Sequence, residues 1–165
     1  MSGHLNPAAL ARQYELTAYC VRKNADGLSN EEGLSAPERG GNSLNWVVGH
    51  VLASRNEFFP LVGLEPFWDE ERMKLYERGS PNVTDAAAAV PLEELLRDLG
   101  RSQEALQGYL KRATPEDLER RLPEPSELLG ETVGQALTVL SFHEAYHAGQ
   151  TGILRRRLGK EGVLK

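Results

Sequence analysis

The chain has little of several features that define whole classes of protein. Its 165 residues include one cysteine, Cys20, which excludes an internal disulfide framework. Cys20 lies among apolar neighbours in the first predicted helix, so we expect an inert core thiol. No apolar run approaches the roughly 20 residues that a membrane-spanning helix needs, and the N-terminus lacks the apolar stretch of a signal peptide. These absences favour a cytoplasmic protein with no membrane partner.

Positive charge is also scarce. There are 19 Lys and Arg residues against 24 Asp and Glu residues, and the basic run Arg155–Arg157 is short and ends a predicted helix. We therefore expect no nucleic-acid partner. The balance of apolar and charged residues is that of an ordinary globular protein, and the length favours one domain over residues 1–165.

No segment alternates apolar and polar residues over the length of a strand, and no internal repeat is visible. Apolar residues instead recur at three- and four-residue steps in four stretches, which predicts four long helices. These stretches cover about residues 7–24, 43–62, 91–112 and 133–158. The sequence therefore predicts an all-α fold, a four-helix bundle around one core.

The connections between these helices differ in character. Residues 25–42 are rich in Gly, Asn, Ser and Glu and are expected to form a polar loop. Residues 63–90 form a long connection with a short helix over 69–78, long enough to cross the bundle and let the second and third helices run parallel. A further turn or two of helix is expected over 114–122, before Pro123 and Pro125 break the chain.

Histidine carries the chemistry that this sequence suggests. His143 and His147 are four residues apart within the apolar stripe of the last helix, so their side chains lie on one face, about 5–6 Å apart at Cβ. Two such imidazoles can bind one metal ion. His50 lies on a flank of the second helix, about 120° from the centre of its stripe, a weaker placement. His4, near the terminus, is expected to have no role.

Each histidine alone is also explained as a hydrogen-bonded core residue. The pair is different, because two adjacent buried imidazoles are costly to satisfy without a shared partner. A third histidine from a facing helix would leave an open position at the metal, as in catalytic sites. Gln150 and Glu57 are one and two turns from His147 and His50, and each is a candidate to support a ligand or simply a polar helix-edge residue.

Residues 143–147 also spell H-E-A-Y-H, the H-E-x-x-H pattern of zinc peptidases. The longer metzincin pattern requires Gly at 150 and His at 153, where this chain has Gln150 and Ile153. No strand is available to bind a peptide, and a di-iron bundle would need a second Glu-x-x-His unit. Both interpretations are therefore disfavoured, and Glu144 is expected to point away from the core.

Two segments resemble the DinB/YfiT-like family of helical metalloproteins. They are S-L-N-W-V-V-G-H-V at 43–51 and F-H-E-A-Y-H-A-G-Q-T-G-I-L-R-R at 142–156. The first is similar to the family's second-helix segment, which ends in one metal-binding histidine, here His50. The second is similar to its H-x-x-x-H-x-G-Q segment, which gives His143 and His147.

The resemblance implies a bundle with parallel second and third helices and a three-histidine site for a divalent ion, usually zinc or nickel. It implies a thiol-dependent S-transferase that uses a low-molecular-weight thiol, or a hydrolase, acting on a small molecule; an isomerase also occurs in the family. Dimers are common in it, so a homodimer is expected.

Two functions from different classes follow. In the first, a metal-bound thiol or water loses its proton near neutral pH and attacks a small electrophile. In the second, the chain is a non-catalytic metal-binding or protein-interaction helical module. Five aromatic residues could line a substrate pocket or belong to the core: Tyr14, Trp46, Phe67, Trp68 and Tyr146.

Overall fold

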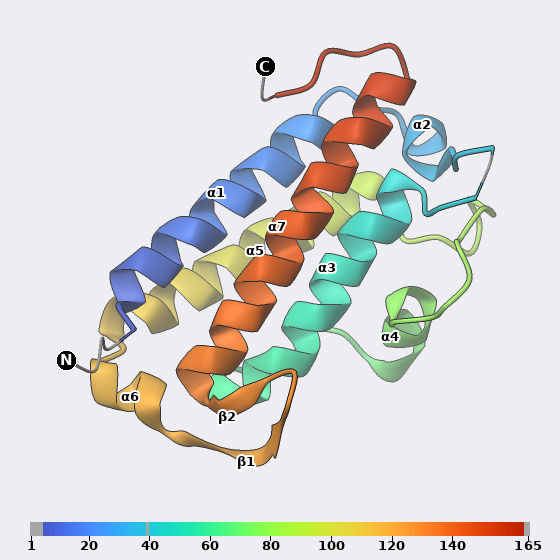
Figure 1. The fold of residues 1–165 in the computed structure, drawn as a ribbon. Helices are drawn as coiled ribbons and strands as arrows, with labels where there is room; N and C mark the ends of the chain where they lie inside the picture. The colour runs from blue at the N-terminus through green and yellow to red at the C-terminus, as the bar shows by residue number, and fades with distance from the viewer. Residues whose placement is uncertain (1–4, 39, 164–165) are drawn as a thin grey trace.

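Four long helices pack side by side in the computed structural model, which describes residues 5–38 and 40–163 (Figure 1). His4 lies outside the described residues. The long helices are α1 (Pro7–Ala25), α3 (Leu44–Phe58), α5 (Leu92–Arg112) and α7 (Val133–Arg157). Both α1 and α3 pack against α5 and α7. Figure 1 shows α3 and α5 running in the same direction, opposite to α1 and α7. The predicted all-α bundle with parallel second and third helices is confirmed.

Local signals set the start of these helices. The side chain of Asn6 accepts a hydrogen bond from the Ala8 amide, and Pro7 fits the first turn, where an amide hydrogen is not needed. Ser43 caps α3 in the same way. Thr132 and Gln135 form a reciprocal capping box at α7, which fixes where the helix that carries two of the histidines begins.

The apolar core falls into two clusters that are stacked along the bundle. One cluster packs around Leu52, Leu95 and Ala148 in the half of the bundle that holds the start of α3. The other packs around Tyr14, Leu106 and Leu137 in the opposite half. On each long helix, the residues between the two clusters in sequence include buried or half-buried polar side chains. The bundle therefore has a polar layer between two apolar ones.

The connection from α3 to α5 is largely ordered against α3. It contains a 3₁₀ turn, η1 (Phe59–Val62), and the helix α4 (Glu70–Tyr76), which is capped by Asp69. α4 packs against α3, where the ring of Tyr76 lies directly over Gly49. The hydroxyl of Tyr76 donates to Asn45 Oδ1 and accepts from the Val90 amide, so it ties the end of the connection to α3.

Three details of the fold differ from expectation. Residues 25–42 include a short helix, α2 (Asn30–Leu34), because Ser29 and Glu32 form a capping box and Leu34 is buried. α3 ends at Phe58 rather than near residue 62, since Pro60 lacks the amide hydrogen that a longer α-helix would use. α6 (Pro115–Glu119) is shorter than the predicted 114–122, because the chain turns extended at Arg120.

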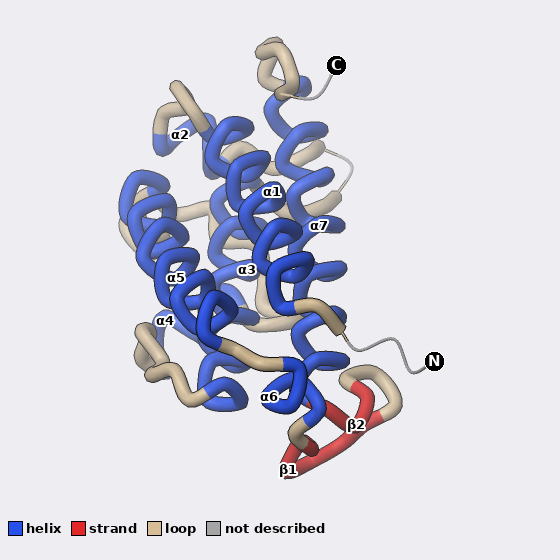
Figure 2. The backbone as a smooth tube through the Cα atoms, turned by 90° about the vertical axis from the view of Figure 1, so that its left-hand side faces the viewer, coloured by secondary structure: helices blue, strands red, loops and turns tan. Residues whose placement is uncertain are grey.

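The expectation of no strand was wrong. Strands β1 (Arg121–Ser126) and β2 (Gly130–Thr132) pair antiparallel just before α7 (Figure 2). β1 carries two prolines, which sequence reasoning took as a break. The hairpin closes locally, because Gly130 adopts φ 79° and the Leu129 amide donates to Ser126 Oγ. None of the helices in the described ranges is long and apolar enough to span a bilayer.

The close packing of Gly49 against Tyr76 gives a test of the fold. A Cβ atom at residue 49 would overlap the Tyr76 ring, so we expect Gly49→Ala to cost about 1–3 kcal/mol in the free energy of unfolding. Urea denaturation measures this. The matched control is Gly100→Ala on α5, where no atom lies within 4 Å of the added methyl. That variant should gain up to about 1 kcal/mol, because alanine is the better helix former. Equal effects at both positions would contradict this packing.

Candidate metal centre

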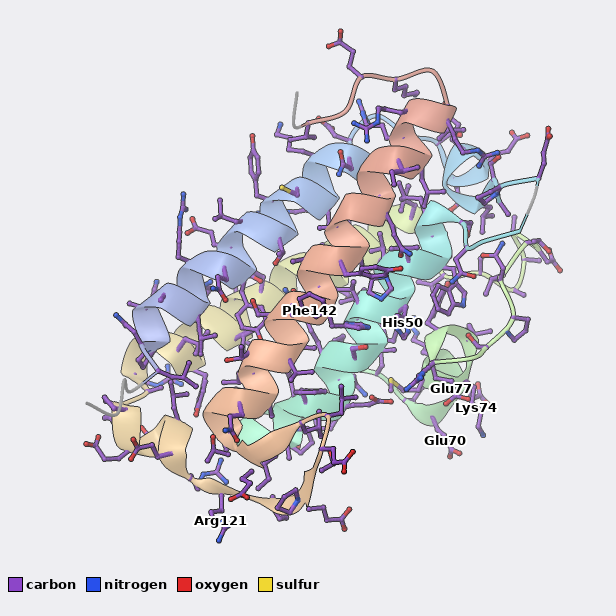
Figure 3. The ribbon with its side chains drawn as sticks, in the orientation of Figure 1. His50, Glu70, Lys74, Glu77, Arg121 and Phe142 are labelled. Atoms are coloured by element: carbon purple, nitrogen blue, oxygen red, sulfur yellow. The ribbon has the colours of Figure 1, made fainter. Side chains whose placement is uncertain are left out.

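Three imidazoles from two helices converge where α3 packs against α7. His50 comes from α3, and His143 and His147 come from consecutive turns of α7; Figure 3 shows this region, with His50 and Phe142 labelled. His143 Nε2 lies 3.1 Å from His50 Nε2 and 3.0 Å from His147 Nε2. One potential ligand atom from each of the three residues lies within 4.8 Å of the others. The flank position of His50 is therefore a buried one.

Hydrogen bonds at the far side of two rings fix which nitrogen faces the centre. His50 Nδ1 lies 2.8 Å from the Tyr76 carbonyl oxygen, and His147 Nδ1 lies 2.7 Å from Gln150 Oε1. Carbonyl oxygens only accept, so both Nδ1 atoms carry the hydrogen in the neutral rings. The Nε2 atoms of His50 and His147 therefore present lone pairs to His143.

Burial keeps the three rings neutral. It lowers the pKa of His143 to about 4, with smaller contributions from the neighbouring His147 and His50. Burial also lowers the pKa of His50 and of His147, more than their bonds to Tyr76 and Gln150 raise it. Neutral imidazole is the form that binds a metal ion.

The three imidazoles do not satisfy one another. If His143 carried its hydrogen on Nε2, it could donate to only one of the two facing lone pairs. If the hydrogen were on Nδ1 instead, it would be buried without a partner among the described residues. A cation accepts all three Nε2 lone pairs at once, so the donor set fits a divalent ion. Imidazole nitrogen is a good ligand for several divalent first-row metals, zinc and nickel among them.

Comparison with known proteins identifies the family and the fold of this chain. The sequence profile of the DinB superfamily matches residues 13–151, which include all three histidines. The chain belongs to the DinB superfamily. A crystal structure of a conserved protein from Enterococcus faecalis superposes with a TM-score of 0.72 over 93% of this chain and 97% of that one. At 17% identity it shows a shared fold. No curated protein matches.

Two of the five aromatic candidates contact the imidazoles of this DinB superfamily protein. Trp46 stacks on His50 with ring centroids 4.7 Å apart, and Tyr146 meets His147 edge-on at 5.3 Å. The others pack elsewhere: Tyr14 donates to the Leu137 carbonyl, Trp68 donates to Asp98, and Phe67 packs against Phe59.

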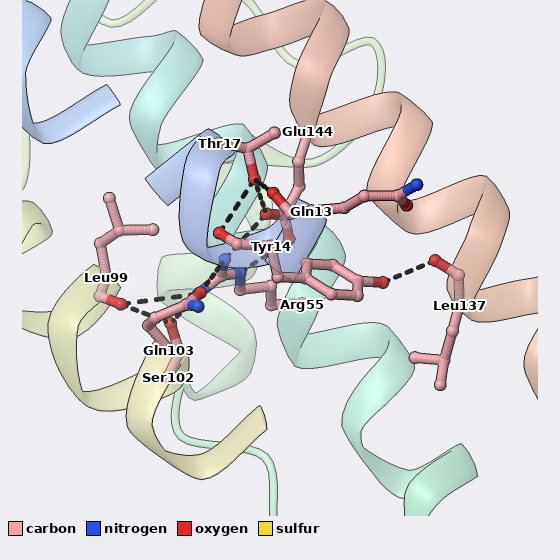
Figure 4. Close-up of polar contacts among 9 residues, drawn as sticks. All are labelled: Gln13, Tyr14, Thr17, Arg55, Leu99, Ser102, Gln103, Leu137 and Glu144. Atoms are coloured by element: carbon pink, nitrogen blue, oxygen red, sulfur yellow. Dashed lines mark hydrogen bonds and ion pairs between the residues drawn. The ribbon is translucent and has the colours of Figure 1, made fainter. Parts of the chain in front are cut away.

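The expectation for Glu144 was wrong. The residue is 1% exposed, and its side chain points into the bundle (Figure 4). The carboxylate accepts two hydrogen bonds from Arg55, from Nε at 2.7 Å and from NH2 at 2.8 Å. The general-base role that H-E-x-x-H gives a peptidase is unavailable to a carboxylate held in this way. Two signals in the sequence could have located its partner: an arginine in the apolar helix α3, and Ser102–Gln103 interrupting the leucines of α5.

The two residues proposed to support the ligands lie differently. Gln150 accepts from His147 Nδ1, as expected of a residue that orients a ligand. Glu57 lies at the surface, where partial desolvation of its carboxylate and the nearby Glu77 carboxylate raise its pKa. No hydrogen bond joins Glu57 to an imidazole in the described part of the chain, so its role stays a prediction.

The lowered histidine pKa values make the stability of the metal-free protein depend on pH. Below about pH 6.5 the unfolded chain takes up protons that the folded chain does not, so stability falls as pH drops toward the folded pKa of about 4 for His143. We expect the urea midpoint of metal-free protein to be lower at pH 5 than at pH 7. His143→Gln should show a smaller fall. An unchanged fall in this variant would show that other groups dominate.

Proposed function

We propose that this protein is a metal-dependent enzyme in which His50, His143 and His147 hold one zinc or nickel ion. The observation that carries the proposal is the convergence of three Nε2 atoms. The Nε2 atom of His143 lies 3.0–3.1 Å from those of His147 and His50, and each of these two presents a lone pair. Three protein ligands leave a coordination position for a substrate, the arrangement of catalytic rather than structural sites.

A divalent ion held there would supply Lewis-acid chemistry, lowering the pKa of a thiol or water in the open position. The residues of the chain prepare the site for this. Tyr76 and Gln150 orient two imidazoles, and burial keeps all three rings neutral. Tyr146 is exposed and places aromatic surface beside His147, where an apolar part of a small electrophile could pack, whereas the buried Trp46 supports the His50 ring from behind. The reaction proposed is transfer of a low-molecular-weight thiol to such a molecule, or its hydrolysis.

The proposal includes a cytoplasmic homodimer that binds neither nucleic acid nor membrane. Large apolar side chains exposed on α1 and α7 support a dimer: Leu16, Tyr19, Phe142, Tyr146 and Ile153. The net charge of −5 supports the absence of a nucleic-acid partner.

A non-catalytic metal-binding or protein-interaction module is the second candidate. The observation that favours it is the burial of the ligands, because His50 and His147 are only 7% and 8% exposed. A substrate would have to approach past the half-buried His143 ring. The two candidates therefore differ in whether a bulky molecule reaches the ion.

Metal content and turnover test the proposal together. Protein stripped of metal and reloaded with zinc or nickel should hold about one ion per chain by mass spectrometry, and His50→Ala and His147→Ala should lose it. Relative to the stripped protein, the loaded protein should accelerate one of two reactions. The first is replacement of the halogen of a chromogenic aryl halide by a low-molecular-weight thiol, with release of halide ion and a proton. The second is hydrolysis of a p-nitrophenyl ester. Bound metal without turnover would favour the non-catalytic module. Absence of bound metal in the wild type would contradict the site.

The hydrogen bond from His147 to Gln150 gives a more specific prediction. Gln150→Leu removes the acceptor at Nδ1 and should weaken zinc affinity about 10- to 100-fold, measured by competition with a chromophoric chelator. Glu57→Gln is the control, because Glu57 makes no hydrogen bond to the imidazoles in the described residues, and its affinity should match the wild type. The reverse pattern would assign the supporting role to Glu57.

A further inference from the structure

We propose that the buried Arg55–Glu144 pair positions the metal ligands by fixing the rotation of α7 about its own axis. The inference rests on the proposed metal site and extends it to two residues that do not touch the ion. Glu144 lies between His143 and His147 in the sequence of α7, and Arg55 lies on the same helix as His50. Both partners of the pair therefore belong to the helices that carry the ligands.

The pair is held from all four long helices (Figure 4). Arg55 is 0% exposed and makes five hydrogen bonds, as many as it has N–H groups. Two go to the Glu144 carboxylate on α7, and three go to α5: to Ser102 Oγ at 3.0 Å, to Gln103 Oε1 at 2.8 Å and to the Leu99 carbonyl at 3.5 Å. From α1, Thr17 Oγ1 lies 3.4 Å from Glu144 Oε2.

This network fills the polar layer between the two apolar clusters. Apolar packing is not directional, so the clusters alone leave α7 some freedom to turn. The two parallel bonds between Arg55 and Glu144 have a fixed geometry, because guanidinium and carboxylate are both planar. At about 100° per residue, the Glu144 side chain leaves α7 about 100° from His143 and about 60° from His147. Fixing the direction of the Glu144 side chain therefore also fixes the directions in which His143 and His147 leave the helix.

Metal ligation is sensitive to such a rotation. With side chains the helix has a radius of about 5–6 Å, so turning α7 by about 10° moves the outer atoms by about 1 Å. Metal–ligand distances tolerate about 0.2 Å. A rotation too small to disturb an apolar contact would therefore displace His143 and His147 from a site shared with His50.

Stability alone does not account for the pair. Burying an ion pair costs so much desolvation that replacement by apolar residues of similar volume is often neutral or stabilising. Replacing both partners therefore separates a role in positioning from a role in stability, whereas replacing only one partner would affect both. An apolar pair at positions 55 and 144 would keep the packing and remove the directional hydrogen bonds that fix the rotation of α7.

The experiment uses the double variant Arg55→Met/Glu144→Leu. We expect the metal-free double variant to remain folded, with one cooperative thermal transition, and to bind zinc about 10- to 100-fold more weakly. Its cobalt-loaded form should show a visible absorption spectrum shifted from that of the wild type. The matched control is Arg121→Met/Glu131→Leu, which removes the exposed ion pair of the hairpin and should leave zinc affinity unchanged.

A second variant keeps the test decisive if the double variant does not fold. Arg55→Lys retains the buried charge pair but loses the two-bond geometry, and it should also weaken zinc binding while far-ultraviolet circular dichroism stays unchanged. Wild-type zinc affinity in either folded variant would overturn the positioning role and leave the metal site intact. A wild-type chain that binds no zinc would instead overturn the proposed function and this inference with it.

Discussion

A guanidinium with no access to water must find an acceptor for every N–H group, and that requirement organises the centre of this bundle. Arg55 meets it with groups from α5 and α7, while α1 contributes a hydroxyl to the carboxylate. An unpaired charge at this depth would cost several kcal/mol. The helices can thus pack closely only in the arrangement that brings these acceptors together. Two apolar clusters then fill the space on either side of the polar layer.

One turn of α7 serves two environments that differ in charge. Glu144 is ionically paired within the layer, whereas His143 and His147 face α3 as neutral rings. All three side chains are largely removed from water, but they meet different partners. Arg55 offers the carboxylate a compensating charge, but no residue does so for the imidazoles. The sequence H-E-A-Y-H therefore combines a buried ion pair with two histidines of the candidate metal centre, whereas in the peptidases the glutamate is a general base.

Periodicity was sufficient to predict the long helices and the placement of two histidines, because three- and four-residue spacing directly reports which side chains share a helix face. His50 was less secure, since its burial depends on α4 and α7 packing over a flank. The direction of Glu144 was predicted wrongly because a residue next to His143 in sequence was assumed to lie on the opposite face of the helix. On a helix, Glu144 is in fact closer in angle to His147 than to the outer surface.

The β1–β2 hairpin was missed because its pairing depends on a turn at Gly130 rather than on strand propensity. Such features depend on partners far away in sequence or on backbone angles. The apolar periodicity of a single helix gives no information about either.

The contact of Tyr76 with α3 has a consequence for how this chain can change over evolutionary time. A loop lengthened by a few residues costs little entropy, so the exposed stretches 65–66 and 84–88 can accept insertions. Tyr76 cannot shift in the same way, since its ring lies over Gly49 and its carbonyl accepts from His50. A one-residue slip of α4 would bring another side chain to the glycine and remove the carbonyl from the imidazole. The segment that reads most like a spacer thus contains a position whose register is as restricted as that of the histidines themselves.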